Sequence, residues 1–545
     1  MSGQTFNRTL RRRGFLTGAA AVATGAAALP LVGCGDDDDD DGSTGGDTNT
    51  AVAPGQGAAT ATPSAEPKRG GTWRRGAGGN IALASLPYID AGTLSGGGNA
   101  AAREPGLIWG NLVRFGPDKL EHIPDHAKEW EMAPDGKSIK FVIRDDIYYH
   151  SGRQFTTKDI AWNLEETKKD KWKTSISARL NPVADYVIHD DFTMTWNLIR
   201  PNAPALDFMA VFRLADMDTI DQIASGTLIG TGSFKWTSYD PVKGATLEAY
   251  DRYHLGRPYL DKIEYTIYAD AAALAIALET GEVADSALSP EESIRFYDNK
   301  DFLTVKLPGS GGTTPMGMRT DLDPLKDRRV RQALELLLDR ERYRDENFVG
   351  RFDEIGRLPW PSFSPAYDAE LDKPIYDPAR AKELMREAGF PNGLPSPVKM
   401  DTLPIRPYSP AIAQLLQQEA REIGIEIQFE PLEYSDMLDR YYKGALDNAW
   451  IGFGDSGSPL SPGVSLLFAT LTDGQVTHYT DPEYLAARQA LIDGGTDYAR
   501  FNRAYLDGAF APVIARPVGV NFESKDIHIS RNVLGWVNYH EVWIG

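Results

Sequence analysis

The residues best suited to chemistry lie in one short stretch of the last third of the chain. Residues 454–459 read Gly-Asp-Ser-Gly-Ser-Pro, so that Ser456 stands between an acidic residue and a glycine. A serine hydroxyl becomes a nucleophile when a histidine accepts its proton and a carboxylate orients that histidine. Ser456 would therefore need two partners elsewhere in the sequence to act on an acyl group.

The rest of the sequence argues against such a hydrolase. Residues 454–459 differ at one position from the Gly-Asp-Ser-Gly-Gly-Pro that surrounds the nucleophile of chymotrypsin-like serine proteases. None of the eight histidines stands in the Ala-Ala-His-Cys sequence of those proteases. Cys34 is the only cysteine, so the disulfides that brace their fold cannot form. We expect a Gly/Ser/Pro-rich loop, with a serine hydrolase that uses Ser456 as a minor alternative.

One pair of histidines has the spacing of a zinc site. His122 and His126 are four residues apart, which would place both imidazoles on one face of a helix. Pro124 lies between them and disfavours a helix there. No further histidine or cysteine cluster in the sequence completes a ligand set. The sequence thus predicts two surface histidines and no metal site.

Two glycine-containing stretches fall short of nucleotide-binding motifs. Residues 136–138 read Gly-Lys-Ser, like the end of a phosphate-binding loop, but Glu131 occupies the position of the required first glycine. Residues 309–314 lack the third glycine of a dinucleotide-binding motif and fit a flexible crossing between two lobes better. With no nucleophile, metal or cofactor motif left, the sequence favours a binding protein without a cofactor over an enzyme.

Length and charge narrow the class of protein further. The chain has 545 residues, which is enough for two or more lobes with cores of their own. It is 42% hydrophobic and carries a net charge of −20. A surface with this excess of carboxylates repels nucleic acid and does not attract anionic lipid. We expect a globular binding protein that does not bind nucleic acid.

The first 33 residues have the features of an export signal rather than of a folded domain. Arg12 and Arg13 form a twin-arginine pattern before a weakly hydrophobic run, residues 15–32, which glycine and proline interrupt. Such a signal suits the Tat route, which exports folded proteins. Residues 31–34 read Leu-Val-Gly-Cys and resemble a lipobox. This pattern predicts that Cys34 is lipidated and becomes the new N-terminus.

The segment that follows the cysteine has no apolar periodicity. Residues 36–41 are consecutive aspartates, and the residues up to 68 are rich in Gly, Thr, Ala and Pro. This composition cannot bury enough apolar surface to fold. We predict a disordered tether over residues 34–68, with a span on the order of 30 Å. It would hold the folded body at the outer face of the cytoplasmic membrane.

Strand and helix patterns alternate in the remaining sequence and predict an α/β fold. In residues 139–143 every second side chain is apolar, as in a half-buried strand. Thr156 or Thr157 can cap the helix that follows. Residues 326–343 place apolar side chains at the spacing of an amphipathic helix. Residues 376–390 do the same between an aspartate cap and a glycine stop.

Five segments of the sequence carry further patterns, and they are residues 70–76, 107–165, 230–288, 326–343 and 376–390. The second reads Pro-x-x-Ala-x-x-Trp, then a strand, an aromatic-His-x-Gly turn and a Thr-x-x-Asp helix start. The third ends in Leu-x-x-Gly-Glu-Val-x-Asp. Taken together and in order, the five segments are similar to the family 5 extracellular solute-binding proteins of ABC transporters, which include dipeptide-, oligopeptide- and nickel-binding proteins. The resemblance extends over about residues 70–545.

The resemblance implies a two-lobed α/β fold of the periplasmic-binding-protein type, with an extra subdomain in the first lobe and a cleft between the lobes. Lobe I would comprise residues 69–312 and 512–545, and lobe II residues 313–511. Two strand-like crossings would join them at residues 309–320 and 510–520, the first rich in glycine that lets the backbone rotate. The resemblance also implies a protein that closes on its solute and docks on an ABC transporter permease, and a monomer suits such closure.

The loop after Trp450 bears on the identity of the solute. In peptide-binding relatives an aspartate three residues after the corresponding tryptophan pairs with the α-amino group of the peptide. Here Phe453 stands in place of that aspartate. Asp455 could replace it, or Trp450 and Phe453 could form an apolar wall for a neutral, sugar-like solute. Packing in the core beneath the loop is the other role open to the two aromatic residues.

Four more aromatic residues belong to segments that face the cleft in this family. Together with the loop residues, the candidate ligand contacts are Tyr88, Trp109, Trp360, Phe363, Trp450, Phe453 and Asp455. The leading hypothesis is a lipid-anchored receptor of an ABC importer that binds an oligopeptide or another small solute. A hypothesis from another class is a receptor that presents its ligand to a sensor partner without transport.

Overall fold

The computed structural model describes most of the chain after residue 65. Arg12, Arg13, Cys34 and the predicted tether up to residue 65 lie outside the described residues. Among the residues that are described, no helix is long and apolar enough to cross a membrane. The described residues are 66–78, 106–119, 121–167, 169, 183–199, 201, 205–240, 242–307, 313–348, 354–403, 408–451, 462, 466, 469–471, 474–516 and 518–545.

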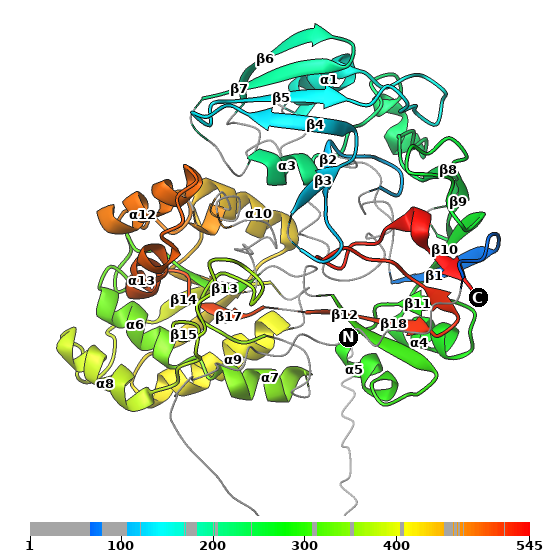
Figure 1. The fold of residues 1–545 in the computed structure, drawn as a ribbon. Helices are drawn as coiled ribbons and strands as arrows, with labels where there is room; N and C mark the ends of the chain where they lie inside the picture. The colour runs from blue at the N-terminus through cyan, green and yellow to red at the C-terminus, as the bar shows by residue number, and fades with distance from the viewer. Residues whose placement is uncertain are drawn as a thin grey trace, which may run out of the picture. The chain divides into compact units, whose positions relative to one another are not determined.

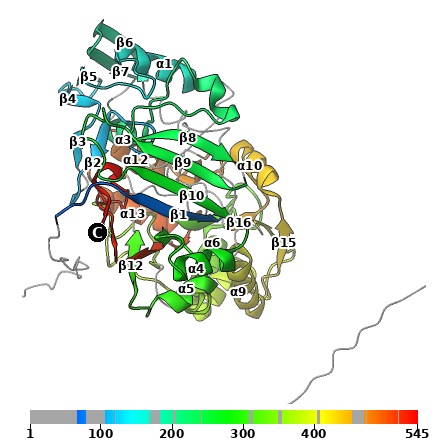
Figure 2. The same cartoon turned by 90° about the vertical axis from the view of Figure 1, so that its right-hand side faces the viewer.

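The first sheet joins the beginning of the described chain to its end. In order across the sheet, its seven strands are β12 (Phe302–Leu307), β18 (Gly519–Ser524), β11 (Asp285–Ser286), β1 (Thr72–Gly78), β10 (Lys262–Tyr268), β9 (Gly244–Ala249) and β8 (Phe234–Asp240). β1 is parallel to β10 and β11, and the other neighbours are antiparallel. Figure 1 shows β18 beside β12, and Figure 2 shows β8, β9, β10 and β1 side by side. Residues near the C-terminus therefore complete this sheet.

A second, antiparallel sheet lies within the long segment between β1 and β8. Its strands in spatial order are β4 (Ala127–Met132), β5 (Ser138–Ile143), β7 (Thr193–Leu198) and β6 (Val183–Asp190). The predicted alternation is confirmed in β5, where Ile139, Phe141 and Ile143 are buried. The predicted helix follows as α1 (Thr157–Thr167), and Asp159 in its first turn accepts a 2.9 Å hydrogen bond from the backbone N–H three residues earlier.

Shorter elements surround these two sheets. Strands β2 and β3 form a hairpin, and β19 pairs with β20 near the C-terminus. α4 packs on β1 and β10 of the seven-stranded sheet. The bounds are β2 (Val113–Phe115), β3 (His122–Pro124), α3 (Ala205–Val211), α4 (Ala271–Glu279), α5 (Pro290–Ser293), β19 (Ile527–His528) and β20 (Trp543–Ile544).

A five-stranded sheet forms the centre of residues 313–516. In spatial order its strands are β15 (Ile427–Pro431), β14 (Val398–Thr402), β16 (Ala449–Ile451), β13 (Thr314–Met318) and β17 (Val513–Ala515). β14 is parallel to β15 and β16, whereas β13 is antiparallel to β16 and β17. The helices are α6 (Arg328–Leu336), α7 (Arg340–Phe348), α8 (Pro378–Glu387), α9 (Tyr408–Glu422), α10 (Tyr434–Lys443), α12 (Pro482–Ile492) and α13 (Tyr498–Gly508).

The helix patterns of the sequence are confirmed in one case and corrected in another. At α8, Asp377 accepts a 2.8 Å hydrogen bond from the backbone of Arg380, and Gly389 ends the helix with a φ of 94°. The single helix predicted over residues 326–343 is instead divided into α6 and α7. Asp339 lies between the two helices and accepts a 3.0 Å hydrogen bond from the backbone N–H of Arg342. A new N-terminal cap therefore starts the second helix.

Two chain segments connect the seven-stranded and the five-stranded sheets, and the strands at both of their ends are paired with each other. Leu307 is the register partner of Gly519 in the first sheet, and Thr314 is the partner of Ala515 in the other. The outgoing segment leaves β12 and enters β13, while the returning segment leaves β17 and enters β18. The last strand of the five-stranded sheet, β17, thus ends at Ala515.

Candidate functional site

The chain connections that leave the ends of β14 and β16, two neighbouring strands of the five-stranded sheet, lead to opposite sides of the sheet. From β14 the chain passes through α9 to β15 on one side, whereas from β16 it passes through α12 and α13 to β17 on the other. In open α/β sheets, ligands bind in the crevice outside the carboxyl ends of the strands at such a switch point. The two carboxyl ends here are Thr402 and Ile451, which are register partners.

Residues 452–461 follow Ile451 directly, so this loop starts at the switch point. It contains Phe453, Asp455 and Ser456, which lie outside the described residues, as does the candidate Tyr88. The first residue of the loop follows the carboxyl end of β16 at Ile451. The topology of the sheet marks this strand end as the edge of a ligand site.

Both crossings between the sheets reach this same edge. β13 is antiparallel to β16, and its residue Met316 is the register partner of Ile451. Thr314, at the start of β13, is in turn the partner of Ala515 at the end of β17. The strand ends that lead into the crossings, at Thr314 and Ala515, therefore lie beside the carboxyl end of β16. A ligand at this edge would lie close to the segments about which the lobes can rotate.

Trp450, the last candidate before the loop, is fully buried in this structure. Its indole lies edge-on to the Tyr441 ring of α10, with centroids 6.1 Å apart. On β13, a Cβ atom built on Gly317 would lie only 2.0 Å from the indole ring. Trp450 packs in a small cluster on one face of the sheet, whose other buried members are Leu403, Met437, Tyr441, Leu446 and Val476.

A buried acid lies on the neighbouring strand beside Trp450. Asp401 of β14 is the register partner of Trp450 and has no exposed surface. One carboxylate oxygen accepts a 2.7 Å hydrogen bond from the backbone of Asp447, and the other lies 3.6 Å from the Arg440 guanidinium. Burial raises the pKa of Asp401 to about 6. In the sequence Asp401 stands in the strand Val-Lys-Met-Asp-Thr, where nothing sets it apart from an ordinary surface carboxylate.

We expect the charge on Asp401 to lower the stability of the fold at neutral pH. The pKa of about 6 in the folded state lies above the usual value of 3.8. Proton binding thus favours the folded state, and this contribution is lost as the pH rises from about 4 to about 7. Urea unfolding of the wild type and of Asp401→Asn checks this, since the asparagine keeps the hydrogen-bond acceptor without the charge. The wild type should lose stability relative to the variant over that range, whereas the exposed control Asp439→Asn should show no such trend.

The other described candidates differ in how much of their surface is accessible. Trp360 is buried, and its indole N–H donates a 2.7 Å hydrogen bond to Asn502 Oδ1. Trp109 is buried in the core of the first lobe. Phe363 is only partly buried, and it packs against that same core although its segment lies between β13 and β14 in the chain. In this conformation the two tryptophans are core side chains, and Phe363 retains exposed surface.

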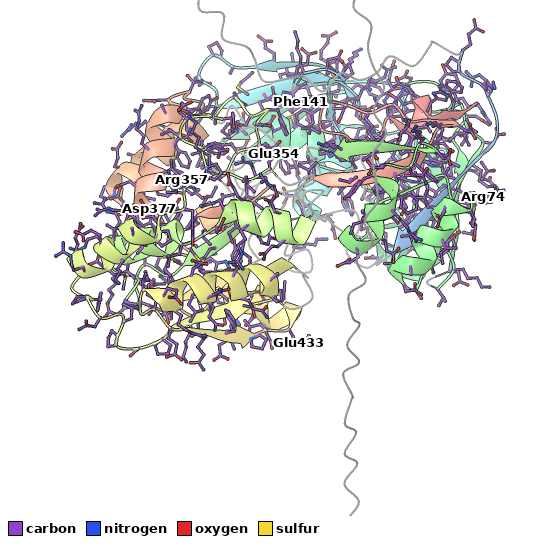
Figure 3. All side chains as sticks on the ribbon, turned by 90° about the horizontal axis from the view of Figure 1, so that it is seen from below. Arg74, Phe141, Glu354, Arg357, Asp377 and Glu433 are labelled. Carbon is purple, nitrogen blue, oxygen red and sulfur yellow. The ribbon has the colours of Figure 1, made fainter. Side chains whose placement is uncertain are left out.

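A buried ion pair anchors the returning crossing at the edge of the sheet. The Arg516 guanidinium, directly after β17, donates hydrogen bonds of 2.9 and 2.6 Å to the two carboxylate oxygens of Asp372. It also donates to the backbone carbonyl of Leu358 at 3.0 Å. Burial lowers the pKa of Arg516, but the hydrogen bonds with Asp372 outweigh this effect and raise it. Figure 3 labels Glu354 and Arg357 on the segment that this pair fixes.

The prediction for the two spaced histidines is confirmed in one respect and wrong in another. As expected from Pro124, they do not lie on a helix, because His122 is in strand β3 and His126 follows Pro124 in the turn before β4. His126 is fully buried rather than on the surface, however, and it lies beside Asp125 and the distant His254. Burial lowers the pKa of His126, so its imidazole is neutral. No local sequence pattern pointed to His254.

The sequence and the fold both have known relatives. Residues 121–475 match the pattern of the bacterial extracellular solute-binding proteins, family 5 Middle. The "Dipeptide-binding protein" of Escherichia coli (strain K12) is 24% identical over 387 residues, which are 65% of this chain and 71% of that protein. "Heme-binding protein A" of Haemophilus influenzae is 24% identical over 401 residues, 67% of this chain and 72% of that protein.

The structural comparison agrees with the sequence comparison. The periplasmic binding protein DppA of Helicobacter pylori, solved in complex with the peptide STSA, superposes with a TM-score of 0.69 at 20% identity. The superposition covers 88% of this chain and 98% of DppA. The two-lobed α/β fold expected from the resemblance is thereby confirmed. Because the family pattern spans well over half of the sequence, this chain belongs to the bacterial extracellular solute-binding proteins of family 5.

Proposed function

We propose that this protein captures a small solute between its two lobes and delivers it to the permease of an ABC importer. The observation that carries the proposal is the shared edge of the five-stranded sheet. There the switch point, the start of the 452–461 loop and both crossings come together. Hinge rotation at the crossings would change how the lobes enclose a solute at this edge. Micromolar affinity needs about −8 kcal/mol, which a few buried aromatic and hydrogen-bonding groups supply.

In this proposal the side chains near the edge have two kinds of role. Phe453 and Asp455 of the loop contact the solute, together with Phe363, which retains exposed surface, and with Tyr88. Trp109, Trp360 and Trp450 are buried, so in this proposal they support the contacting side chains from within the cores. In this arrangement the 452–461 loop has the largest influence on which solute is bound.

The proposal includes export and anchoring. The twin-arginine pattern at Arg12 and Arg13 supports export by the Tat route, and Leu-Val-Gly-Cys at residues 31–34 supports lipidation of Cys34. An anchored chain with a flexible tether keeps the binding domain near the permease, which raises its effective concentration there. Family membership supports an extracytoplasmic location.

We expect position 453 to decide whether a peptide with a free amino group is bound tightly. A Phe453→Asp variant would supply a carboxylate where the peptide-binding relatives have one, and a buried charge pair of this kind adds at least about 1.4 kcal/mol, or tenfold in affinity. Calorimetric titration with a tripeptide and with the same tripeptide N-acetylated measures the effect. The variant should gain affinity for the free tripeptide alone.

A Phe453→Asn variant is the matched control for this experiment, because it adds a polar group without charge and should gain no affinity. If the wild type already binds the free tripeptide tightly and Asp455→Asn abolishes that binding, Asp455 supplies the carboxylate instead. Equal affinities of wild type, Phe453→Asp and Phe453→Asn for both peptides would show that this position does not decide the class of solute.

A further inference from the structure

Three potential metal ligands meet in the interior of the first lobe. Asp125 and His126 lie in the turn between β3 and β4, and His254 lies in the turn between β9 and β10. Asp125 Oδ1 lies 2.7 Å from His254 Nε2 and 3.4 Å from His126 Nδ1. One ligand atom from each of the three residues lies within 4.8 Å of the other two. Two imidazoles and one carboxylate are a common ligand set for transition metals.

The cluster is almost completely removed from solvent. The side chains of Asp125, His126 and His254 are 7%, 0% and 1% exposed. Within the described part of the chain, His254 Nδ1 has no hydrogen-bond partner. The nitrogen that faces Asp125 is Nε2, so an ion bound between the three residues would be held by Nε2 of His254.

A supporting residue holds one of the imidazoles in place. His126 Nε2 lies 2.8 Å from Thr231 Oγ1, which also accepts a 3.1 Å hydrogen bond from the backbone N–H of Gly110. When Nε2 carries the proton and donates to Thr231, the lone pair of Nδ1 points toward Asp125 and is available to a metal. Metal-binding histidines generally have such a partner on their other nitrogen. A Cβ on Gly110 would lie 1.8 Å from the His126 ring, so the ring fits only beside glycine.

A small cavity adjoins the cluster. It has about 40 Å³ of space for water, and Asp125, Tyr253 and His540 are among the residues that line it. One water molecule needs roughly 10–15 Å³ by this measure. Asn111 also lines the cavity, and its Oδ1 has no hydrogen-bond partner among the described residues. A water molecule at the carboxylate end of the cluster therefore has space and polar partners.

We propose that Asp125, His126 and His254 bind one divalent transition-metal ion, with Zn²⁺ as the ion that fits best and water as the fourth ligand. Bonds of 2.0–2.1 Å in a tetrahedral site place neighbouring ligand atoms about 3.3 Å apart. The distances of 2.7 and 3.4 Å bracket this value, so small side-chain movements admit the ion. Imidazole ligands disfavour Ca²⁺ and Mg²⁺, which prefer oxygen.

The ion would join segments that are distant in the chain. Asp125 and His254 are 129 positions apart, and each belongs to a turn at the end of a strand of the first lobe. Binding to the folded state alone raises stability by mass action. All three ligands belong to turns of the first lobe, so the metal would serve that lobe as a structural link.

Metal titration of untagged protein after chelator treatment tests the proposal. We expect the wild type to bind one Zn²⁺ per chain, to show the visible absorption of tetrahedral Co²⁺ when cobalt replaces zinc, and to gain several degrees in its unfolding midpoint. His254→Gln should lose the Zn²⁺ site and the stabilisation. Thr231→Val should weaken Zn²⁺ binding about 10–100-fold, and Thr231→Ser should restore it. The control His189→Gln, an exposed histidine, should bind zinc like the wild type.

Circular dichroism of each variant without metal shows whether it folds. If His254→Gln does not fold, the Thr231→Val and Thr231→Ser pair decides the question, because neither substitution removes a metal ligand. Absence of stoichiometric Zn²⁺ in the wild type, or equal Zn²⁺ affinity in Thr231→Val and the wild type, would overturn the proposal. In that case the three residues form a metal-free hydrogen-bonded cluster.

Discussion

Replacing Arg516 by methionine is expected to lower the free energy of unfolding by about 3–5 kcal/mol, because it leaves the buried carboxylate of Asp372 without its counter-charge. Both side chains are nearly inaccessible, with exposed fractions of 6% and 4%. The loss should appear in urea unfolding curves at neutral pH. It should be accompanied by weaker solute binding, because Arg516 fixes the segment of Trp360 and Phe363 to the returning crossing.

An exposed ion pair of similar geometry is the control. Arg500 donates hydrogen bonds of 2.7 and 2.9 Å to the two oxygens of Glu483, but both side chains are exposed. Arg500→Met should therefore cost less than about 1 kcal/mol. The double variant Arg516→Met/Asp372→Asn should be more stable than Arg516→Met, because no charge is left buried. If Arg516→Met and Arg500→Met lowered the free energy of unfolding equally, burial of the Arg516–Asp372 pair would contribute nothing to stability.

Gly317→Ala is expected to destabilise the protein by about 1–3 kcal/mol, the usual cost of overpacking a core, and to disturb solute binding. The new Cβ would lie 2.0 Å from the indole of Trp450, which is enclosed by Tyr441 and its other neighbours. The ring must shift, and the loop that carries Phe453 begins two residues after it. Thermal unfolding and calorimetric titration with the solute measure the two effects.

Making space for the new methyl group should reverse the effect. Trp450→Leu alone leaves a cavity in the cluster and is expected to destabilise the protein. In Gly317→Ala/Trp450→Leu the methyl group fills part of that cavity, so the double variant should be more stable than the sum of the two losses predicts. Additive losses would mean that residues 317 and 450 do not contact each other in solution.

The regular parts of the fold were predictable because they depend on local patterns. The alternation in residues 139–143 and the aspartate–proline start and glycine end of α8 are local signals, and the structure has each of them. The break between α6 and α7 was missed because Leu337 and Leu338 continue the apolar spacing while being buried outside a helix. The apolar pattern alone does not distinguish a continuous helix from a bend that buries the same residues.

The buried polar groups could not be predicted, since their partners are distant in the sequence. Arg516 meets Asp372 across 144 positions, and His254 meets Asp125 across 129. No local pattern in the sequence distinguishes these residues from other charged or polar ones, because only the folded sheets bring the partners together. The ligand contacts were proposed from resemblance, and the structure adds the switch point and the crossings that lead to the same edge.

The central claim is that the protein holds one small solute, and native mass spectrometry tests it most directly. The protein would be purified without added solute, treated with chelator to remove metal, and measured before and after incubation with filtered growth medium. The account predicts a species heavier than the polypeptide by one small molecule, which disappears on denaturation and can then be identified. The mass of the bare polypeptide alone, before and after incubation, would contradict it.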